Sequence, residues 1–388
     1  MPAPSAQSTR PASQSGTRHD PGGCVLELLR RTSRSEHEAA TGRWVGERLA
    51  TLLGFRYAGL YSPENAVCGP IYLIPDRTLL VDEARALGIA TARDLLGGVV
   101  PHDFVGTKAI THPLLDDARA IPPGWSHGLA RAIADVTLPG WSAFDLDDAA
   151  QAGRALLAQG LPVRIKPGDV MGGHGQSVAK NEKELDVAIA GLDRAAIGRA
   201  GVVLELNLKP VKTYSVGVLE VGPHRMAYFG TQRLVQNHEG AAVYGGSSLA
   251  CLRGGLDELT HALSEEAERR VLQCAMRYDE EVQRAYPQVF ASRRNYDVAL
   301  GVDPSGMPRC GVLEQSWRIG GATPAELLAL EAMHLDNRLQ RIQVSTHEVY
   351  DIVDPPLGAQ VSFRGDDPAA GRMTKYAIVD TQDDPHGR

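Results

Sequence analysis

The chain has 388 residues, of which 43% are apolar and 22% are charged. This apolar content can build a core of normal size, which excludes global disorder, and the length predicts two or three domains at about 100–200 residues each. The 40 Lys and Arg residues against 47 Asp and Glu residues give a net charge of −7. A nucleic acid is therefore not expected as the main partner, because phosphate contacts need a basic surface.

Cysteine usage and hydropathy indicate a cytoplasmic protein. The five cysteines, at positions 24, 68, 251, 274 and 310, show no metal-binding spacing, and their odd number fits free thiols in a reducing compartment. No apolar run approaches the roughly 20 residues that cross a bilayer, so no membrane partner is expected. Residues 1–23 lack the apolar stretch of a secretory signal and are rich in Ser, Pro, Gly and Ala, which predicts a disordered leader.

Residues 24–105 are predicted to form an N-terminal α/β domain. Ser35 and Glu38 form a capping-box pattern at the start of a helix that ends at Gly54. The apolar runs 55–61 and 71–75 are typical of buried strands, and short helices are expected near 78–87 and 91–96.

The rest of the chain changes from a helical pattern at 106–160 to extended runs separated by two helices. Asn181 caps the first of these helices, and the second covers 256–286. Thr323, Pro324 and Glu326 predict a further helix start with Thr323 as the cap. Residues 363–388, rich in Gly, Asp and Pro, are predicted to be a mobile tail. The predicted strands are 163–166, 176–180, 201–206, 214–221, 224–235, 296–302 and 309–315.

The stretch VRIKPGDVMGGHGQSVAK (163–180) carries the most informative local pattern. An extended run ends in Lys166, a glycine-rich turn follows, and a second extended run begins. The amides of such a loop can bind phosphates while the lysine supplies positive charge. It is not a Walker A motif, because no Gly-Lys-Ser/Thr occurs and a strand follows instead of a helix. A glycine-rich hairpin with a surface lysine explains this stretch equally well on its own.

The run GVVLELNL (201–208) places Glu205 within a predicted buried strand. A lone acid in apolar surroundings needs a partner. The alternative is that Glu205 faces solvent by simple alternation.

A predicted hairpin at 295–316 carries two acids, Asp297 and Glu314, on neighbouring strands. Ser316 and Arg318 share the face of Glu314, because side chains alternate with a period of two. Two acids that face one way repel each other unless a cation lies between them, and Mg²⁺ prefers such oxygen ligands. An ordinary polar sheet face is the alternative.

The order of these features resembles the ATP-grasp superfamily. In DFVGTKAITHPLL (103–115), Lys108 matches a lysine that reaches the nucleotide in that superfamily, and its spacing to Lys166 is typical. The resemblance covers residues 60–335, and with GGVVPHDFVGTKAITHPL the chain is most similar to a family of uncharacterised ATP-grasp proteins. It implies an α/β (α+β) ATP-grasp fold in three parts. These are the N-terminal domain at 24–105, a first lobe with a glycine-rich lid at 106–208, and a C-terminal lobe with the metal site at 209–362.

The resemblance also implies a role for each matching residue. Lys108 and Lys166 would contact the nucleotide phosphates, and Arg318 would steady the acyl phosphate or an anionic substrate, so Lys166 and Arg318 are the expected catalytic residues. The magnesium ligands would be Asp297, Glu314 and Ser316. The lid over the phosphates would consist of Gly172, Gly173, His174 and Gly175. The adenine would lie against Glu205, Leu206, Asn207 and Leu208.

Three departures from the superfamily pattern affect these assignments. Ser316 stands where most members have an Asn metal ligand, so its hydroxyl would bind more weakly or through water. Thr213 stands where an acid for the ribose hydroxyls is usual, which leaves the ribose contact unassigned. The loop between the two metal strands is longer than usual, so Asp303 competes with Asp297, although Asp303 lies in an apparent turn.

A long polar loop is predicted at 231–248, beside the catalytic sheet, and is a candidate site for the acceptor substrate. A structural loop is the alternative. His238 could act as a base toward an amine, but a solvent-exposed histidine fits equally. The candidate substrate residues are Arg233, Asn237, His238 and Tyr244, with Gln232 beside them.

The sequence thus predicts an ATP- and Mg²⁺-dependent ligase. A carboxylate would be activated as an acyl phosphate and attacked by an amine or thiol, both substrates being small molecules. An ATP-dependent small-molecule kinase and a non-catalytic nucleotide-binding regulator are the alternatives, and Ser316 and Thr213 favour the regulator. The oligomeric state is open, with a homodimer as one option.

Overall fold

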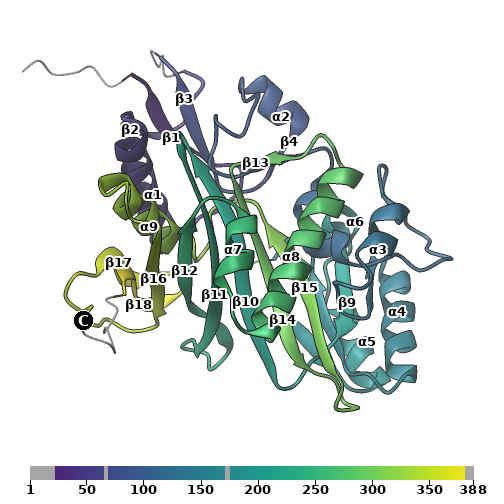
Figure 1. The fold of residues 1–388 in the computed structure, drawn as a ribbon. Coiled ribbons are helices and arrows are strands. Elements are labelled where there is room, and N and C mark those ends of the chain that lie inside the picture. The colour runs from purple at the N-terminus through teal and green to yellow at the C-terminus, as the bar shows by residue number, and fades with distance from the viewer. Residues whose placement is uncertain (1–21, 65–68, 171–174, 381–388) are drawn as a thin grey trace, which may run out of the picture.

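The structure is a computed structural model that describes residues 22–64, 69–170 and 175–380 (Figure 1). The predicted leader up to residue 21, Cys68 and the lid residues Gly172, Gly173 and His174 lie outside the described residues. Within the described ranges, no helix is both long enough and apolar enough to span a membrane.

The N-terminal part begins with a parallel sheet of order β2-β1-β3 packed on helix α1. Ser35 and Glu38 form the predicted capping box, and Gly54 ends the helix with a φ of 67°. Gly54 is needed there because a positive φ strains residues that have a Cβ. The bounds are β1 (Cys24–Leu28), α1 (Glu36–Leu53), β2 (Arg56–Leu60) and β3 (Ile71–Pro75). This confirms the helix and both strands, but of the two strands predicted to be buried only β3 is, because β2 is half-buried with exposed ends.

A second small sheet, of order β13-β5-β4, joins the N-terminal part to the C-terminal part. Its strands are β4 (Leu79–Leu80), β5 (Gly98–Val100) and β13 (Phe290–Ala291), and α2 (Val81–Ala86) follows β4. The helix expected near 91–96 is wrong. Leu95 forms a parallel bridge with Leu73, which holds this segment extended beside β3.

The next part is an antiparallel sheet of order β6-β9-β7-β8, with α4 and α5 packed on it. The prediction of a mainly helical stretch at 106–160 holds only for its short helices and α4, because β6 and extended segments occupy much of it. The strands are β6 (Gly140–Ala143), β7 (Val163–Pro167), β8 (Ser177–Ala179) and β9 (Val202–Leu206). The helices are η1 (Asp103–Gly106), η2 (Lys108–Thr111), α3 (His127–Ala132), α4 (Leu146–Ala158), α5 (Glu182–Ala190) and α6 (Arg194–Ala200).

The largest sheet has eight strands in the order β15-β14-β10-β11-β12-β16-β18-β17. Along β11, Ala227 and Phe229 face the cluster with α8, whereas Met226 and Tyr228 face the cluster with α1 and α9, as alternation requires. Figure 1 shows α7 and α8 in front of β10, β11 and β14. The bounds are β10 (Val211–Val221), β11 (His224–Gln236), β12 (Ala242–Arg253), α7 (Leu256–Ala262), α8 (Glu266–Ala285), β14 (Arg293–Val302), β15 (Pro308–Ser316), α9 (Thr323–Leu335) and β16 (Arg341–Val349).

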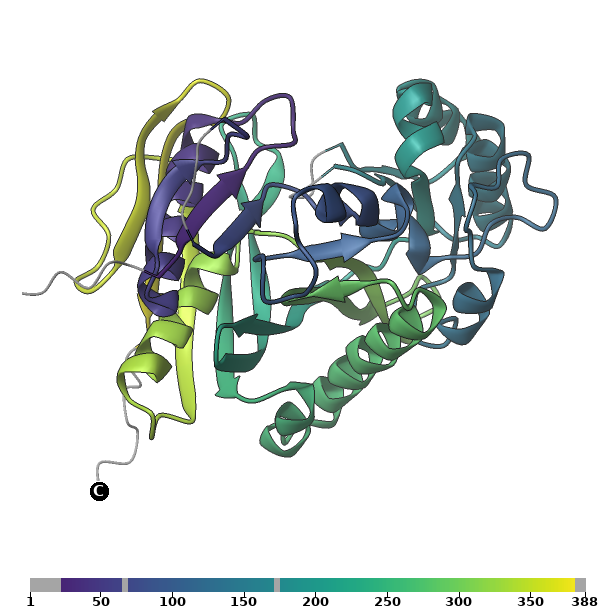
Figure 2. The same cartoon turned by 90° about the horizontal axis from the view of Figure 1, so that it is seen from above.

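The segment predicted as a mobile tail instead forms two strands up to residue 379. They are β17 (Gln360–Asp367) and β18 (Gly371–Val379), and β18 pairs with β16. β17 also packs against α1, so an N-terminal helix and a C-terminal strand lie side by side (Figure 2). One hydrophobic core therefore contains residues from α1, α9 and the large sheet, and it crosses the domain boundary expected at 105.

Two further expectations are corrected. The predicted long loop at 231–248 is the hairpin of β11 and β12, closed by residues 237–241. Glycine allows this pairing at Gly246, where a Cβ would lie 2.0 Å from the Thr346 carbonyl oxygen. The cap of α9 is Ala322 rather than Thr323, and the Thr323 hydroxyl accepts a hydrogen bond from the Gly320 amide.

Candidate active site

A single large cavity of 1460 Å³ connects the four-stranded sheet, the eight-stranded sheet and the start of α1. This volume exceeds the about 300–1,000 Å³ of most small-molecule pockets, so it has room for more than one ligand. Its walls include β7, the linker after β9, strands β10, β11, β14 and β15, and the loop 316–324.

Lys166 lies near the end of β7 and lines the cavity. Its Nζ is 2.7 Å from Glu205 Oε1 and donates to the Leu313 carbonyl oxygen at 3.0 Å. Burial lowers the pKa of Lys166, although the adjacent Glu205 carboxylate opposes this. An ammonium group has three donors, so one N–H remains beyond these two contacts.

Glu205 is held between Lys166 and a residue that sequence reasoning did not single out, His112. The His112 Nε2 lies 3.0 Å from Glu205 Oε2, while Oε1 faces Lys166. Burial by itself would raise the pKa of Glu205, but Lys166 and His112 outweigh it and lower the pKa. Glu205 was expected to line the adenine. Its backbone borders the cavity, yet both of its carboxylate oxygens are engaged with other side chains.

Lys108, at the start of η2, reaches the same region from the other side. Its Nζ lies 3.0 Å from Glu314 Oε2 and donates to the carbonyl oxygens of Val170 at 2.7 Å and Pro167 at 3.4 Å. All three donors are therefore engaged, and Lys108 is not among the described residues that line the cavity. The prediction of a phosphate contact from Lys108 requires it to leave at least one of these partners.

The linker after β9 borders an apolar part of the cavity. Leu206 and Leu208 form a small cluster there with Leu138 and Ala299. The amides of Leu206 and Asn207 donate to the carbonyls of Pro139 and Pro162, whereas the Leu208 amide has no acceptor within the described residues.

The side chain of Asn207, a residue expected to lie at the adenine, contacts a cation of β7. Its Oδ1 accepts from Nε and Nη2 of Arg164, at 3.1 and 2.7 Å. Arg164 lines the cavity two residues before Lys166, so both cations lie on one face of β7.

Asp297 and Glu314 are directly opposite each other on β14 and β15, as predicted, and both line the cavity. Burial and the neighbouring Glu314 raise the pKa of Asp297 to about 6. Burial opposes ionisation of Glu314 as well, but Lys108 and Lys166 lower its pKa. A bulge next to this pair leaves Leu313 without a partner on β14, and its carbonyl is the one that accepts from Lys166.

Three polar side chains hold Asp297 by one oxygen. Its Oδ1 accepts from Gln232 Nε2 at 2.7 Å, Asn295 Nδ2 at 2.9 Å and Ser215 Oγ at 3.4 Å. The side-chain Oδ1 of Asn295 in turn accepts a hydrogen bond from the Tyr228 hydroxyl at 2.9 Å. Asp297 Oδ2 accepts no hydrogen bond from the described residues, which leaves it available as a ligand for a cation.

Ser316 lies opposite Asn295 in the strand register and lines the cavity, as predicted. The rival acid Asp303 caps the β14–β15 turn, where it accepts from the amides of Ser305 and Met307 and pairs with Arg309 at 2.9 Å. Across the described ranges, no group of three or more His, Cys, Asp or Glu side chains could hold a metal ion. A cation at this site would therefore have two acidic protein ligands, supplemented by hydroxyl groups and by ligands that do not come from the protein.

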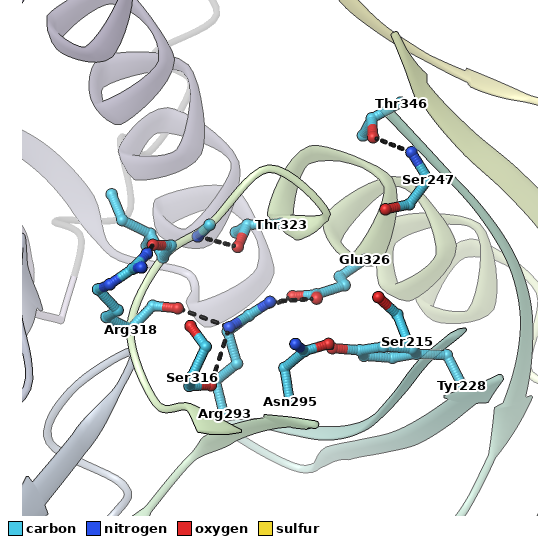
Figure 3. Close-up of polar contacts among 12 residues, drawn as sticks. Ser215, Tyr228, Ser247, Arg293, Asn295, Ser316, Arg318, Thr323, Glu326 and Thr346 are labelled. Atoms are coloured by element: carbon cyan, nitrogen blue, oxygen red, sulfur yellow. Dashed lines mark hydrogen bonds and ion pairs between the residues drawn. The ribbon is translucent and has the colours of Figure 1, made fainter. Parts of the chain in front are cut away.

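Arg318 and Arg293 lie close together at the loop before α9 but differ in their partners (Figure 3). Arg293 forms a two-pronged ion pair with Glu326, with both N–O distances at 2.7 Å. Arg318 lines the cavity and donates to the Ile319 carbonyl at 2.8 Å, but it has no carboxylate partner in the described part of the chain. Burial, together with the nearby charges of Arg293 and Arg31, lowers the pKa of Arg318 to about 10 although Glu314 opposes the change.

Of the four candidate acceptor residues on the β11–β12 hairpin, three line the cavity and one does not. Asn237, His238 and Tyr244 line the cavity. Arg233 does not, because its guanidinium donates to the Gly245 carbonyl at 2.7 Å and lies 2.8 Å from His347 Nδ1. The Tyr244 hydroxyl is shared between Ser247 at 2.7 Å and Thr346 at 3.1 Å, so Tyr244 is part of the cavity wall.

The loop between β7 and β8 is the predicted glycine-rich turn, although its central part lies outside the described residues. Gly175 has a φ of 65°, a conformation that favours glycine. At Gly168 a Cβ would meet the Ala200 carbonyl oxygen at 2.0 Å. Both ends of the loop therefore require glycine for backbone reasons.

Comparison with protein families gives a match over most of the chain. The family described as "Protein of unknown function (DUF3182)" matches residues 25–377. The chain belongs to this DUF3182 family. No curated protein matches its sequence.

Solved structures show that the DUF3182 chain has the ATP-grasp fold. The biotin carboxylase–beta-gamma-ATP complex from Campylobacter jejuni matches with a TM-score of 0.53 at 12% identity, covering 92% of this chain and 87% of that one. The biotin carboxylase domain of 2-oxoglutarate carboxylase from Hydrogenobacter thermophilus gives 0.52 at 15%, covering 92% and 86%. N5-carboxyaminoimidazole synthetase from Staphylococcus aureus, complexed with ADP, gives 0.50 at 12%, covering 93% and 94%.

Several cavity residues of the DUF3182 chain had only weak signals in its sequence. Arg164 could have been found, because VRIK places it on the same face as Lys166. Gln232, Ser215 and Asn295 meet at Asp297 from three different strands, and only the register of those strands reveals this. His112 gave no signal, because its partner Glu205 lies 93 positions away.

Proposed function

We propose that the protein is an ATP-dependent ligase that activates a carboxylate as an acyl phosphate for attack by an amine or thiol. The observation that carries this proposal is the set of groups around one cavity. Lys166, the paired acids Asp297 and Glu314, and the unpaired Arg318 all line it, next to an apolar slot. Phosphoryl transfer depends mainly on positioning and charge stabilisation, and these groups are suited to both tasks.

The nucleotide would lie with its base against Leu138, Leu206, Leu208 and Ala299. The unused amide of Leu208 is suited to donate to an acceptor on the base edge. The remaining N–H of Lys166 would bind a phosphate oxygen, and Arg164 could add a second positive charge. Lys108 would contact phosphate only after exchanging its ion pair with Glu314 for one with the nucleotide.

The donor set fits magnesium. Asp297 and Glu314 offer carboxylate oxygens from opposite strand positions, and Ser316 offers a hydroxyl from the same wall of the cavity. Burial and the neighbouring Glu314 raise the pKa of Asp297 to about 6, so a cation bound at this pair would stabilise the Asp297 carboxylate. Held by these residues, magnesium would offset the negative charge of the phosphates during transfer.

Arg318 would hold the carboxylate substrate and later the acyl phosphate. A guanidinium binds both groups in a two-pronged manner, and a buried one without a carboxylate partner is suited to an anionic ligand. Asn237, His238 and Tyr244 also line the cavity, and its volume leaves room for the nucleophile. Exclusion of water there would protect the acyl phosphate from hydrolysis.

The experiment is ADP release by the purified protein with MgATP and a panel of carboxylates, each tested with and without amines and thiols. We expect ADP release to depend on one carboxylate, and a condensed product to appear only with the nucleophile. Failure to bind ATP at millimolar concentration would contradict the proposal. A stable phosphorylated product without condensation would identify a kinase instead.

A further inference from the structure

His112, Glu205 and Lys166 form a buried chain of contacts that ends at the cavity. Their exposed fractions are 1%, 0% and 2%, and the two carboxylate oxygens of Glu205 are divided between His112 at 3.0 Å and Lys166 at 2.7 Å. Lys166 lines the cavity, whereas His112 does not. His112 therefore contacts no ligand in the cavity directly, and any effect on one passes through Glu205.

We propose that His112 is a positioning residue, which orients Lys166 toward the nucleotide phosphates by fixing the Glu205 carboxylate. The inference rests on the proposed nucleotide binding. In this proposal the Glu205 carboxylate orients Lys166 and does not contact the adenine.

The division of donors explains what His112 contributes. The Lys166 Nζ lies 2.7 Å from Glu205 Oε1 in an ion pair and donates a hydrogen bond to the Leu313 carbonyl at 3.0 Å, which leaves a further N–H for the cavity. Because His112 occupies Oε2, the carboxylate engages the lysine through a single oxygen. Without His112, the carboxylate is free to rotate and bind Lys166 with both oxygens, which withdraws the third donor from the cavity.

The protonation state agrees with this role. Burial lowers the pKa of His112 despite the adjacent Glu205, so the ring is neutral near neutral pH. A neutral ring with its proton on Nε2 donates to Glu205 without adding a charge, and the carboxylate stays paired with Lys166. The ring nitrogen Nδ1 is buried and has no partner in the part of the chain that the structure describes, so the Glu205 contact is the hydrogen bond that fixes the ring.

The backbone that carries His112 is itself held in place. The Thr111 hydroxyl donates to the Lys108 carbonyl at 2.7 Å, and the Ser142 hydroxyl donates to the Ala109 carbonyl at 2.6 Å. On the far side of His112, the Ser142 amide donates to the Pro113 carbonyl at 2.8 Å. Strand β6 thus fixes a segment that bears both Lys108 and His112, the two residues that contact Glu314 and Glu205.

The test compares ADP with adenosine, because only ADP carries the phosphates that Lys166 would bind. Isothermal titration would measure both ligands with wild type, His112→Leu, His112→Gln and the matched control His127→Gln, whose side chain is exposed on α3. For His112→Leu we expect ADP to bind about tenfold more weakly or worse, as for a lost hydrogen bond to a charged group, with adenosine affinity unchanged. His112→Gln keeps a donor and should recover part of the loss.

Equal weakening of ADP and adenosine by His112→Leu would overturn the inference, because a merely structural residue affects both. Unchanged ADP binding would also overturn it. If His112→Leu does not fold, His112→Gln alone provides the test, and a smaller loss confined to ADP affinity is expected. Wild-type protein that binds neither ligand would instead contradict the proposed function, so the two failures are distinguishable.

Discussion

The two ends of the cavity, proposed to bind the nucleotide (the nucleotide end) and the acceptor substrate (the acceptor end), differ in how their charges are balanced. At the nucleotide end, Lys166 and Lys108 are paired with Glu205 and Glu314 at 2.7 and 3.0 Å. At the acceptor end, Arg318 has no carboxylate partner among the described residues, although Arg293 beside it is paired with Glu326. Breaking a buried ion pair is costly, whereas a half-buried cation without a carboxylate partner is a candidate site for an anionic ligand.

The largest expected effect is on turnover and comes from replacing Glu314. Glu314→Gln removes a proposed magnesium ligand and the partner of Lys108. We expect turnover to fall below about one thousandth of wild type, equivalent to about 4 kcal/mol of lost transition-state stabilisation. Steady-state ADP release checks this, with Asp303→Asn as a control in the turn of the same hairpin. Activity near wild type in Glu314→Gln would remove Glu314 from the site.

The next effect separates the two arginines by stability. Arg293→Met leaves Glu326 buried without its partner, so we expect the free energy of unfolding to fall by about 3 kcal/mol or more. Arg318→Met removes no ion pair and should change it by less than about 1 kcal/mol. Urea denaturation of both variants measures the difference. Equal losses would show that the two arginines have the same structural role.

A smaller effect separates the same arginines by binding. Arg318→Met should raise the KM for the activated carboxylate by about 30-fold, since a charge-assisted contact contributes about 2 kcal/mol. The KM for ATP should change much less, because Lys166 lies at the nucleotide end of the cavity. Steady-state kinetics with one substrate varied at a time provides the comparison. A larger change for ATP than for the carboxylate would reverse the order of the two ends.

The smallest effect concerns pH. Because the pKa of Asp297 is raised to about 6 from 3.8, the folded state binds more protons than the unfolded state between these values. Stability without metal should therefore fall as pH rises from about 4 to about 6, and the penalty persists above 6. Asp297→Asn should be more stable than wild type at pH 7.5 by about 1 kcal/mol. Thermal unfolding at several pH values tests this, and a difference independent of pH would contradict it.

Much of the fold could be predicted because its buried elements carry local signals. The capping box of α1 and the apolar, β-type runs of β10 and β11 identify these elements without tertiary information. The strands β17 and β18 could not be found in this way. Their exposed positions carry Gln, Val, Arg and Asp with no apolar pattern, and pairing with β16 and with each other keeps them extended.

The site was predictable where residue type alone restricts the chemistry. Lys166, Asp297, Glu314 and Arg318 all line one cavity, as their pattern implied. Roles that depend on which atom faces which partner were not predictable. The Asn207 side chain accepts from Arg164, and the Arg233 guanidinium donates to a backbone carbonyl, and neither partner could be named from the sequence. Local sequence cannot set these directions, because the partners come from other strands.

The most direct test of the central claim follows the oxygen atoms of the carboxylate. Once the panel identifies a carboxylate that supports ADP release, the reaction is repeated with that compound labelled with ¹⁸O, and the released phosphate is analysed by mass spectrometry. Formation and breakdown of an acyl phosphate transfers one labelled oxygen from each carboxylate to phosphate, so the account predicts singly labelled phosphate in step with ADP. Unlabelled phosphate alone would contradict carboxylate activation in this cavity.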